Sequence, residues 1–260
     1  MNEPFWQEQQ GTGPLVAVAI HDGHGMRDEL TRHLALDEAG RLREEDPFTG
    51  DWTAIAPTRI VVCRSRFEVD LNRPREKAVY RTPEDAWGLK VWKGSLPEEI
   101  CERSLSEYDA FYSRMHALLT EIERASGRFV VFDLHSYNHR RGGPDAPPAD
   151  PEMNPQVNLG TGSMDRARWG PVVDRFIQEL RGFDFPGGRL DVRENVKFRG
   201  GQFSCWVHQT FPRTGCALAI EFKKFFMDEW TGEPDQDLVR TIDTALHAVV
   251  PGVLEALNRL

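Results

Sequence analysis

The stretch FVVFDLH, residues 129–135, decides the fold class. Its apolar residues follow one another without polar alternation, and Asp133 and His135 stand at its end. Short continuous apolar runs of this kind are typical of strands covered on both faces, as in the parallel sheets of α/β proteins. The stretch therefore predicts a central strand that delivers two ionisable side chains to one edge of a sheet.

A long helix is predicted directly before this strand, over residues 97–126. Apolar residues recur there at steps of three and four from Leu105 to Ile122, which is the spacing of one helix face. Pro97 stands in the first turn and Gly127 follows the last turn. These residue types are favoured at the start and just past the end of a helix, so the boundaries are well marked.

Strand and helix patterns alternate along the rest of the chain. Buried strands are predicted at 15–20, 60–62 and 216–222, a short strand in VNLGTG (157–162), and helices within 26–46, at 165–181 and over 235–260, the last with a kink or break at Pro251–Gly252. This order predicts an α/β fold with helices on both faces of the sheet. Residues 14–260 are expected to form a single domain after a polar arm at 1–13.

The composition restricts the class of partner. The chain has 260 residues, 40% of them hydrophobic, and a formal net charge of −9, so the basic stripe of a nucleic-acid surface is not expected. The first residues lack the basic and apolar regions of a signal peptide, and no apolar run approaches the ~18 residues of a membrane helix. The four cysteines form no CxxC pair, which favours reduced thiols. We expect a soluble, cytoplasmic protein without nucleic-acid or membrane partners.

Histidines come at the ends of two predicted strands. The sequence AIHDGHG (19–25) places His21 and His24 after one strand, and His135 ends another. Ligands of open α/β sheets bind outside the carboxyl ends of the strands, so these side chains are expected to meet. Three imidazoles hold a divalent zinc ion and leave one position open for water, as in catalytic sites. For AIHDGHG alone, the alternative is a turn with two solvated histidines.

A carboxylate on a third strand suits the same site. Glu221 interrupts the apolar strand CALAIEF (216–222), and a buried glutamate is costly unless it is paired or functional. A single carboxylate beside a metal accepts a proton from water and later donates it to the leaving group. The alternative is a structural role for Glu221, as an ion-pair partner of Lys223 or as the solvent-facing end of the strand.

Arginines gather in RSRFEVDLNRPR, which contains Arg66, Asn72 and Arg73, and Arg199 precedes a Gly-Gly pair. Arginine binds carboxylates bidentately and polarises carbonyl groups. Arg66, Arg73 and Arg199 are therefore candidates for binding a carboxylate or polarising a carbonyl group, and the alternative for any single one of them is a solvated surface side chain.

Six motifs together resemble a known family. IHDGHG, FEVDLNR, FDLHS, VNLGTG, NVKFRGGQFS and CALAIEF occur in the order and approximate spacing of the N-formylglutamate amidohydrolase family, a distant relative of the zinc carboxypeptidases and the aspartoacylase-type deacylases. The resemblance covers roughly residues 15–230. The chain departs from many family members at IHDGHG, where they carry a Pro-His-Ser-Gly type of motif.

The resemblance implies a fold and a set of roles. The fold is a three-layer αβα arrangement around a mixed, mostly parallel sheet, similar to that of the zinc carboxypeptidases, with one Zn²⁺ per chain. By position, His21 and His135 resemble metal ligands, and His24 falls where the wider superfamily has a glutamate ligand. Asn72 and Arg73 match an Asn-Arg pair that faces the substrate and the oxyanion, and Glu221 matches the glutamate that handles the water proton.

The resemblance also implies the reaction, which is removal of the N-formyl or another N-acyl group from an acidic amino acid such as N-formylglutamate. Two alternatives remain at this point. The same site would serve a metallopeptidase or amidase acting on short or cell-wall peptides. A protein of another class, a non-catalytic metal-containing binding protein, would instead hold its metal in a closed structural site. The oligomeric state is open.

Overall fold

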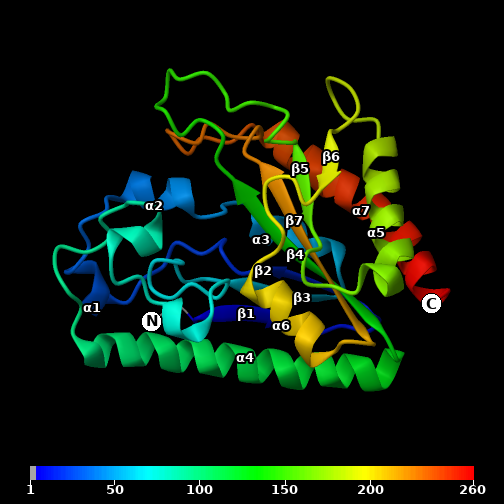
Figure 1. Ribbon diagram of the computed structural model, residues 1–260, viewed down its shortest axis with the longest axis horizontal. Helices are drawn as coiled ribbons and strands as arrows, with labels where there is room; N and C mark the ends of the chain where they lie inside the picture. Colours follow the sequence, from blue (N-terminus) through cyan, green and yellow to red (C-terminus); the bar gives the residue numbers. More distant parts are fainter. Residues whose placement is uncertain (1–3) are drawn as a thin grey trace.

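A computed structural model describes residues 4–260, which form one mixed sheet covered by helices (Figure 1). In the order β1-β3-β2-β4-β7-β5-β6, the described strands are β1 (Trp6–Gln9), β3 (Thr58–Val62), β2 (Leu15–Ala19), β4 (Phe129–Tyr137), β7 (Gly215–Lys223), β5 (Val157–Gly160) and β6 (Val192–Glu194). The pairs β1–β3 and β5–β7 are antiparallel, and the remaining neighbours are parallel. The sheet is therefore mixed and mostly parallel, as the family resemblance implied.

Helices cover both faces of this sheet. The long α4 (Glu98–Ser126) and α6 (Gln202–Thr210) pack on one face, and α5 (Arg166–Gly182) and α7 (Gln236–Asn258) pack on the other (Figure 1). Three short helices lie in the connection from β2 to β3: α1 (Asp28–Thr31), α2 (Glu38–Glu44) and α3 (Thr49–Trp52). Each face has its own apolar core, which confirms the predicted three-layer α/β architecture.

No helix in the described part of the chain is long and apolar enough to cross a membrane.

The central strand β4 shows why the sequence FVVFDLH lacks alternation. All nine residues of β4 are buried. Val130, Phe132 and Leu134 belong to the core under α5 and α7, whereas Phe129 and Val131 belong to the core under α4 and α6. Successive side chains of a strand point to opposite faces, so both faces of β4 must be apolar. The same alternation places Asp133 and His135 on the face that carries α4 and α6.

Several segments differ from the sequence prediction, among them α6, for which no helix was predicted. Within the expected polar arm, Trp6–Gln9 forms β1, whose residues alternate between half-buried and exposed along the edge of the sheet. Residues 26–46 contain two short helices instead of one. Helix α7 continues through Pro251 without a break, and Gly252 permits close packing on α5, because a Cβ there would lie 2.6 Å from Arg175 Nε.

The loop after β2 packs directly against the backbone that follows β3. A Cβ at Gly23 would lie 2.2 Å from the carbonyl carbon of Cys63, so backbone atoms would have to move. We predict that Gly23→Ala lowers the free energy of unfolding by about 1–3 kcal/mol, the usual cost of overpacking. Urea denaturation would measure this change. Gly182→Ala is the control, since nothing lies within 4 Å of the added Cβ; equal stabilities of the two variants would contradict the prediction.

Candidate metal centre

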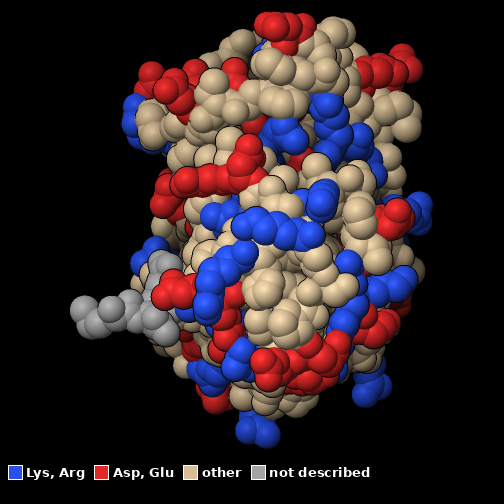
Figure 2. Space-filling model, turned by 90° about the vertical axis from the view of Figure 1, so that its left-hand side faces the viewer, with Lys and Arg blue, Asp and Glu red and all other residues tan. Residues whose placement is uncertain are grey.

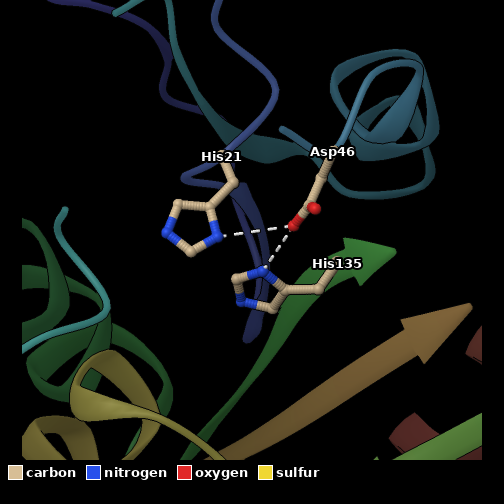
Figure 3. Close-up of side chains that lie close together, drawn as sticks. All are labelled: His21, Asp46 and His135. Carbon is tan, nitrogen blue, oxygen red and sulfur yellow. Dashed lines mark hydrogen bonds and ion pairs between the residues drawn. The ribbon is translucent and has the colours of Figure 1, made fainter. Parts of the chain in front are cut away.

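Three buried side chains from separate segments converge at the carboxyl ends of the parallel strands. They are His21, just after β2, His135, on β4, and Asp46, between α2 and α3 (Figure 3). Asp46 Oδ2 lies 3.0 Å from His135 Nδ1 and 3.4 Å from His21 Nδ1. The three ligand atoms lie within 4.8 Å of one another, which makes this a group able to hold a metal ion.

The sheet brings the two histidines together, and a backbone contact adds the aspartate. Strands β2 and β4 are parallel neighbours, with Val18 opposite Asp133, so their carboxyl ends meet at the same edge. The backbone N–H of Asp46 donates to the carbonyl oxygen of His21 at 2.9 Å. This hydrogen bond connects the segment after α2 to the end of β2.

Two further carboxylates hydrogen-bond to the imidazoles on the side away from Asp46 and orient the rings. His21 Nε2 donates to Asp70 Oδ1 at 2.7 Å, and His135 Nε2 donates to Asp133 Oδ1 at 2.9 Å. Both aspartates are fully buried. Metal-binding histidines usually give their other ring N–H to a carboxylate in this way, which fixes the tautomer and directs the free nitrogen at the metal. The contacts thus turn both Nδ1 atoms toward Asp46, where a bound cation would replace the Nδ1 protons.

Charge at the centre also favours a cation. Burial alone would lower the pKa of His135, but the charge of Asp133 and hydrogen bonds with Asp133 and Asp46 hold it well above its usual value. Burial alone would raise the pKa of Asp46, but hydrogen bonds from His135 and His21 hold it below its usual range. Buried carboxylates require compensation, and a divalent cation between two imidazoles and Asp46 provides it. The residues present therefore fit a metal ion.

His24, which the sequence placed third in the ligand set, lies outside this group. Its Nδ1 is 2.5 Å from Glu45 Oε2, and its Nε2 is 2.9 Å from a guanidinium nitrogen of Arg41. Both ring nitrogens are therefore already engaged, and Asp46 occupies the third position instead. The loop after Gly23 bends toward the end of β3, where Gly25 N–H donates to Cys63 O at 2.9 Å, and this path carries His24 away from His135.

Asp46 was missed because nothing in its sequence context marks it. It follows a short helix and precedes a proline in a polar turn, and no predicted strand ends there. Asp70 belonged to the arginine-rich stretch, but its contact with His21 spans 49 positions and has no local signature.

Seven of the eight residues predicted for the site line one pocket of about 230 Å³. These are His21, Arg66, Asn72, Arg73, His135, Arg199 and Glu221. The strand ends and the loops before α4 and α6 form its walls, so residues spread over most of the chain meet in one place.

Glu221 faces the centre from the strand beside His135. The register of β4 and β7 pairs the two residues directly, and Asn158 of β5 pairs with Glu221 on its other side. Burial raises the pKa of Glu221 to about 7, against the opposing charge of His135. Its carboxylate has no hydrogen-bond partner within residues 4–260. A carboxylate with this pKa exchanges protons readily near neutral pH.

The predicted substrate-binding residues differ in how much of their hydrogen-bonding capacity is free. Arg66 is committed to Asp70 Oδ2 at 2.8 Å and also contacts Glu44 O at 3.3 Å. The Oδ1 atom of Asn72 accepts the N–H of Phe203 at 3.1 Å and thereby caps α6. Arg199 is exposed and forms no side-chain hydrogen bond or ion pair with the described residues.

Arg73 keeps a looser set of contacts than Arg66. Its NH2 group donates to the carbonyl oxygen of Asp85 at 3.2 Å, and its Nε lies 3.8 Å from Asp70 Oδ2. Its guanidinium also lies over the ring of Trp87, 5.7 Å from the centroid. Arg73 is about one-third exposed, so it is the more accessible of the two arginines that contact Asp70.

The pocket also contains residues that the sequence analysis did not single out. Trp87, Arg141 and Lys224 line it, and Arg141 forms a bidentate ion pair with Glu44 at 2.9 and 3.1 Å. Lys and Arg side chains gather on the face shown in Figure 2, the side of the molecule where α1 and α2 lie in Figure 1. A local basic surface therefore coexists with a net charge of −9.

The fold and the site define an α/β protein with a candidate metal centre at the carboxyl edge of a mixed sheet. The chain matches the N-formylglutamate amidohydrolase family over residues 13–227. This match covers most of the sequence, and the chain belongs to that family. The resemblance seen in the six sequence motifs is thereby confirmed.

Two solved structures share the fold over nearly their whole length. An N-formylglutamate amidohydrolase from Ralstonia eutropha has a TM-score of 0.76 at 17% identity, covering 98% of this chain and 98% of that chain. A gene product from Agrobacterium tumefaciens has a TM-score of 0.67 at 17% identity, covering 97% and 96%. A metallo-carboxypeptidase from Pseudomonas aeruginosa has a TM-score of 0.36 at 15% identity, covering 94% of this chain and 57% of that chain. No curated protein matches the sequence.

His208 has a structural role outside the pocket. Its Nε2 accepts the backbone N–H of Ala217 at 3.0 Å, so the ring proton lies on Nδ1, which is 2.8 Å from Ser163 Oγ. The imidazole donates to Ser163 and has no free lone pair to activate that hydroxyl as a nucleophile. Burial lowers the pKa of His208 to about 4.

This shift predicts a dependence of stability on pH. Between pH 6.5 and about 4, the unfolded chain binds a proton at His208 that the folded chain does not, so stability falls as the pH falls through this window. The full loss is about 3 kcal/mol. Urea titrations at pH 7, 5.5 and 4.5 would measure it. His208→Gln should flatten the profile and the half-exposed His247→Gln should not; identical profiles for all three proteins would refute the assignment.

Proposed function

We propose that this protein is a zinc-dependent amidohydrolase that removes the N-formyl or another N-acyl group from an acidic amino acid, such as N-formylglutamate. The observation that carries the proposal is the group of His21, Asp46 and His135 with Glu221 beside it in one pocket. Membership of the family supports hydrolysis of a linear amide bond.

His21, Asp46 and His135 would hold the zinc ion, one per chain, through two imidazole nitrogens and a carboxylate oxygen. Two histidines and one carboxylate are a donor set of catalytic zinc sites. Bound there, zinc would polarise an amide carbonyl and lower the pKa of water. Asp70 and Asp133 keep the Nε2 protons in place, so the Nδ1 atoms, which face Asp46, are the ones that would give up their protons and bind the ion.

Glu221 handles the protons of the reaction. Its carboxylate accepts a proton from the attacking water and later delivers it to the nitrogen of the leaving amine. Burial raises the pKa of this carboxyl group, which favours its return of the proton to the leaving group. Pairing with His135 in the β4–β7 register holds Glu221 beside the metal ligands.

Arginine and amide groups bind the rest of the substrate. Arg73 and Asn72 line the pocket and supply N–H donors for the negative charge that develops on the carbonyl oxygen. Arg199, whose guanidinium has no partner among the described side chains, binds a substrate carboxylate. Arg66 is held by Asp70, so it contributes positive charge to the pocket and orients Asp70.

The size of the pocket favours a single amino acid over a peptide. Sites for drug-sized ligands usually measure about 300–1,000 Å³, whereas this pocket measures about 230 Å³. A residue-sized N-acyl amino acid suits that volume better than an extended peptide does.

Asp46 and His24 distinguish the ligand set proposed from the structure from the one predicted by sequence. We expect Asp46→Ala and His135→Ala to lose stoichiometric zinc, because each removes one of the three proposed ligands. His24→Ala should retain about one zinc per chain, because its ring contacts Glu45 and Arg41. Metal analysis of the purified proteins measures this. Zinc loss in His24→Ala together with retention in Asp46→Ala would overturn the ligand assignment.

Glu221→Gln tests the reaction itself. The amide cannot accept the water proton, so we expect kcat for formate release from N-formylglutamate to fall about 10²–10⁴-fold, with zinc content unchanged. Glu255→Gln, at an exposed position of α7, should retain full activity.

Parallel assays with N-acetylglutamate and short peptides identify the substrate. Faster turnover of peptides than of N-formylglutamate would replace the proposed substrate with a peptide. Bound zinc with no hydrolysis of any of these compounds would favour a non-catalytic binding protein. Full activity in Glu221→Gln would remove this residue from the mechanism.

A further inference from the structure

Lys224 is a fully buried lysine that the reaction does not use. It directly follows β7 and is 1% exposed. Its Nζ donates to the carbonyl oxygen of Arg43 at 2.6 Å and to that of Glu45 at 2.7 Å. Burial lowers its pKa to about 8, opposed by nearby carboxylates that include Asp46. The side chain therefore carries an ammonium group at neutral pH, and burying that group requires strong hydrogen bonds.

The two carbonyl groups belong to the end of α2, just before Asp46. Helix α2 ends at Glu44, and Glu45 leaves it in an extended conformation. The last carbonyls of a helix have no partners within the helix, and a cation at that end satisfies them and interacts favourably with the helix dipole. Lys224 thus holds the backbone just before Asp46 in place through two hydrogen bonds.

The backbone of Asp46 itself is also held by hydrogen bonds. Its backbone N–H donates to His21 O at 2.9 Å, and its carbonyl oxygen accepts the Thr49 hydroxyl at 2.6 Å. The carboxylate of Asp46 contacts His135, but neither of these two backbone contacts comes from the strands that carry His135 and Glu221. Lys224 supplies that connection, because its own N–H donates to Tyr137 O at 3.0 Å and so continues the pairing of β7 with β4.

We infer that Lys224 is a positioning residue that sets the place of Asp46 relative to His135, and thereby sets the affinity of the centre for a divalent metal. The inference rests on the metal centre proposed above. The ammonium group bridges the strand pair of His135 and Glu221 to the segment that carries the third ligand. Without it, two buried carbonyls lose their donor, the segment turns to find other partners, and the Asp46 carboxylate moves from its place 3.0 Å from His135 Nδ1.

Lys224→Met tests this, because methionine keeps most of the apolar stem and removes the ammonium group. We expect the dissociation constant for zinc, measured by chelator competition, to rise about 10–100-fold, as for other residues that orient metal ligands. We also expect the visible spectrum of the cobalt-substituted protein to change, because the carboxylate ligand has moved. A loss of stability alone would leave that spectrum as in the wild type.

Lys223→Met is the matched control. The neighbouring lysine also donates to a backbone carbonyl, that of Asn154 at 3.1 Å, but this segment carries no metal ligand. It should keep the wild-type zinc affinity and cobalt spectrum. Lys224→Gln retains N–H donors on a shorter side chain and should give an intermediate affinity; if Lys224→Met does not fold, this variant decides the question.

The outcomes separate this inference from the proposed function. Zinc affinity of the Lys224 variants within twofold of that of Lys223→Met, with an unchanged cobalt spectrum, would overturn the inference and leave the metal centre standing. A wild-type protein that binds neither zinc nor cobalt would overturn the metal centre, and the inference with it.

Discussion

Each imidazole of the centre is held between two carboxylates, and the arrangement of the site depends on this. His21 lies between Asp46 and Asp70, and His135 lies between Asp46 and Asp133. Asp70 and Asp133 fix the ring orientations, while Asp46 lies beside the Nδ1 atoms of both rings. Buried negative charge is costly without compensation. The carboxylates that orient the candidate ligands therefore also favour the binding of a cation.

Asp70 connects this centre to the rest of the pocket. Besides His21, it accepts hydrogen bonds from the Arg66 guanidinium, the Tyr80 hydroxyl and the backbone N–H of Asn72. Asn72 in turn caps α6, next to the loop that carries Arg199. One buried carboxylate thus orients a candidate metal ligand and anchors the segment that carries the proposed substrate-binding groups. The candidate metal centre and the pocket beside it are therefore connected by one network of hydrogen bonds.

The elements that the sequence predicted well are those with a strong local pattern. Strands β2, β4 and β7 are continuous apolar runs, and the spacing in α4 follows one helix face over its whole length. Strand β1 was missed because its short polar sequence, WQEQ, lies at the sheet edge and buries little. Helix α6 was missed because it begins after a Gly-Gly pair and depends on a cap from Asn72, which is distant in sequence.

The sequence by itself determined the α/β class, the family motifs and the ionisable residues at the strand ends, because these depend on local periodicity and on the direction of parallel strands. Only the tertiary structure decided that Asp46, and not His24, completes the group of candidate ligands, and that Arg66 is committed to Asp70 while the guanidinium of Arg199 has no partner among residues 4–260. The contact between Asp46 and His135 spans 89 positions, and that between Lys224 and Glu45 spans 179. Contacts at such separations arise from the packing of whole elements, which no local pattern encodes.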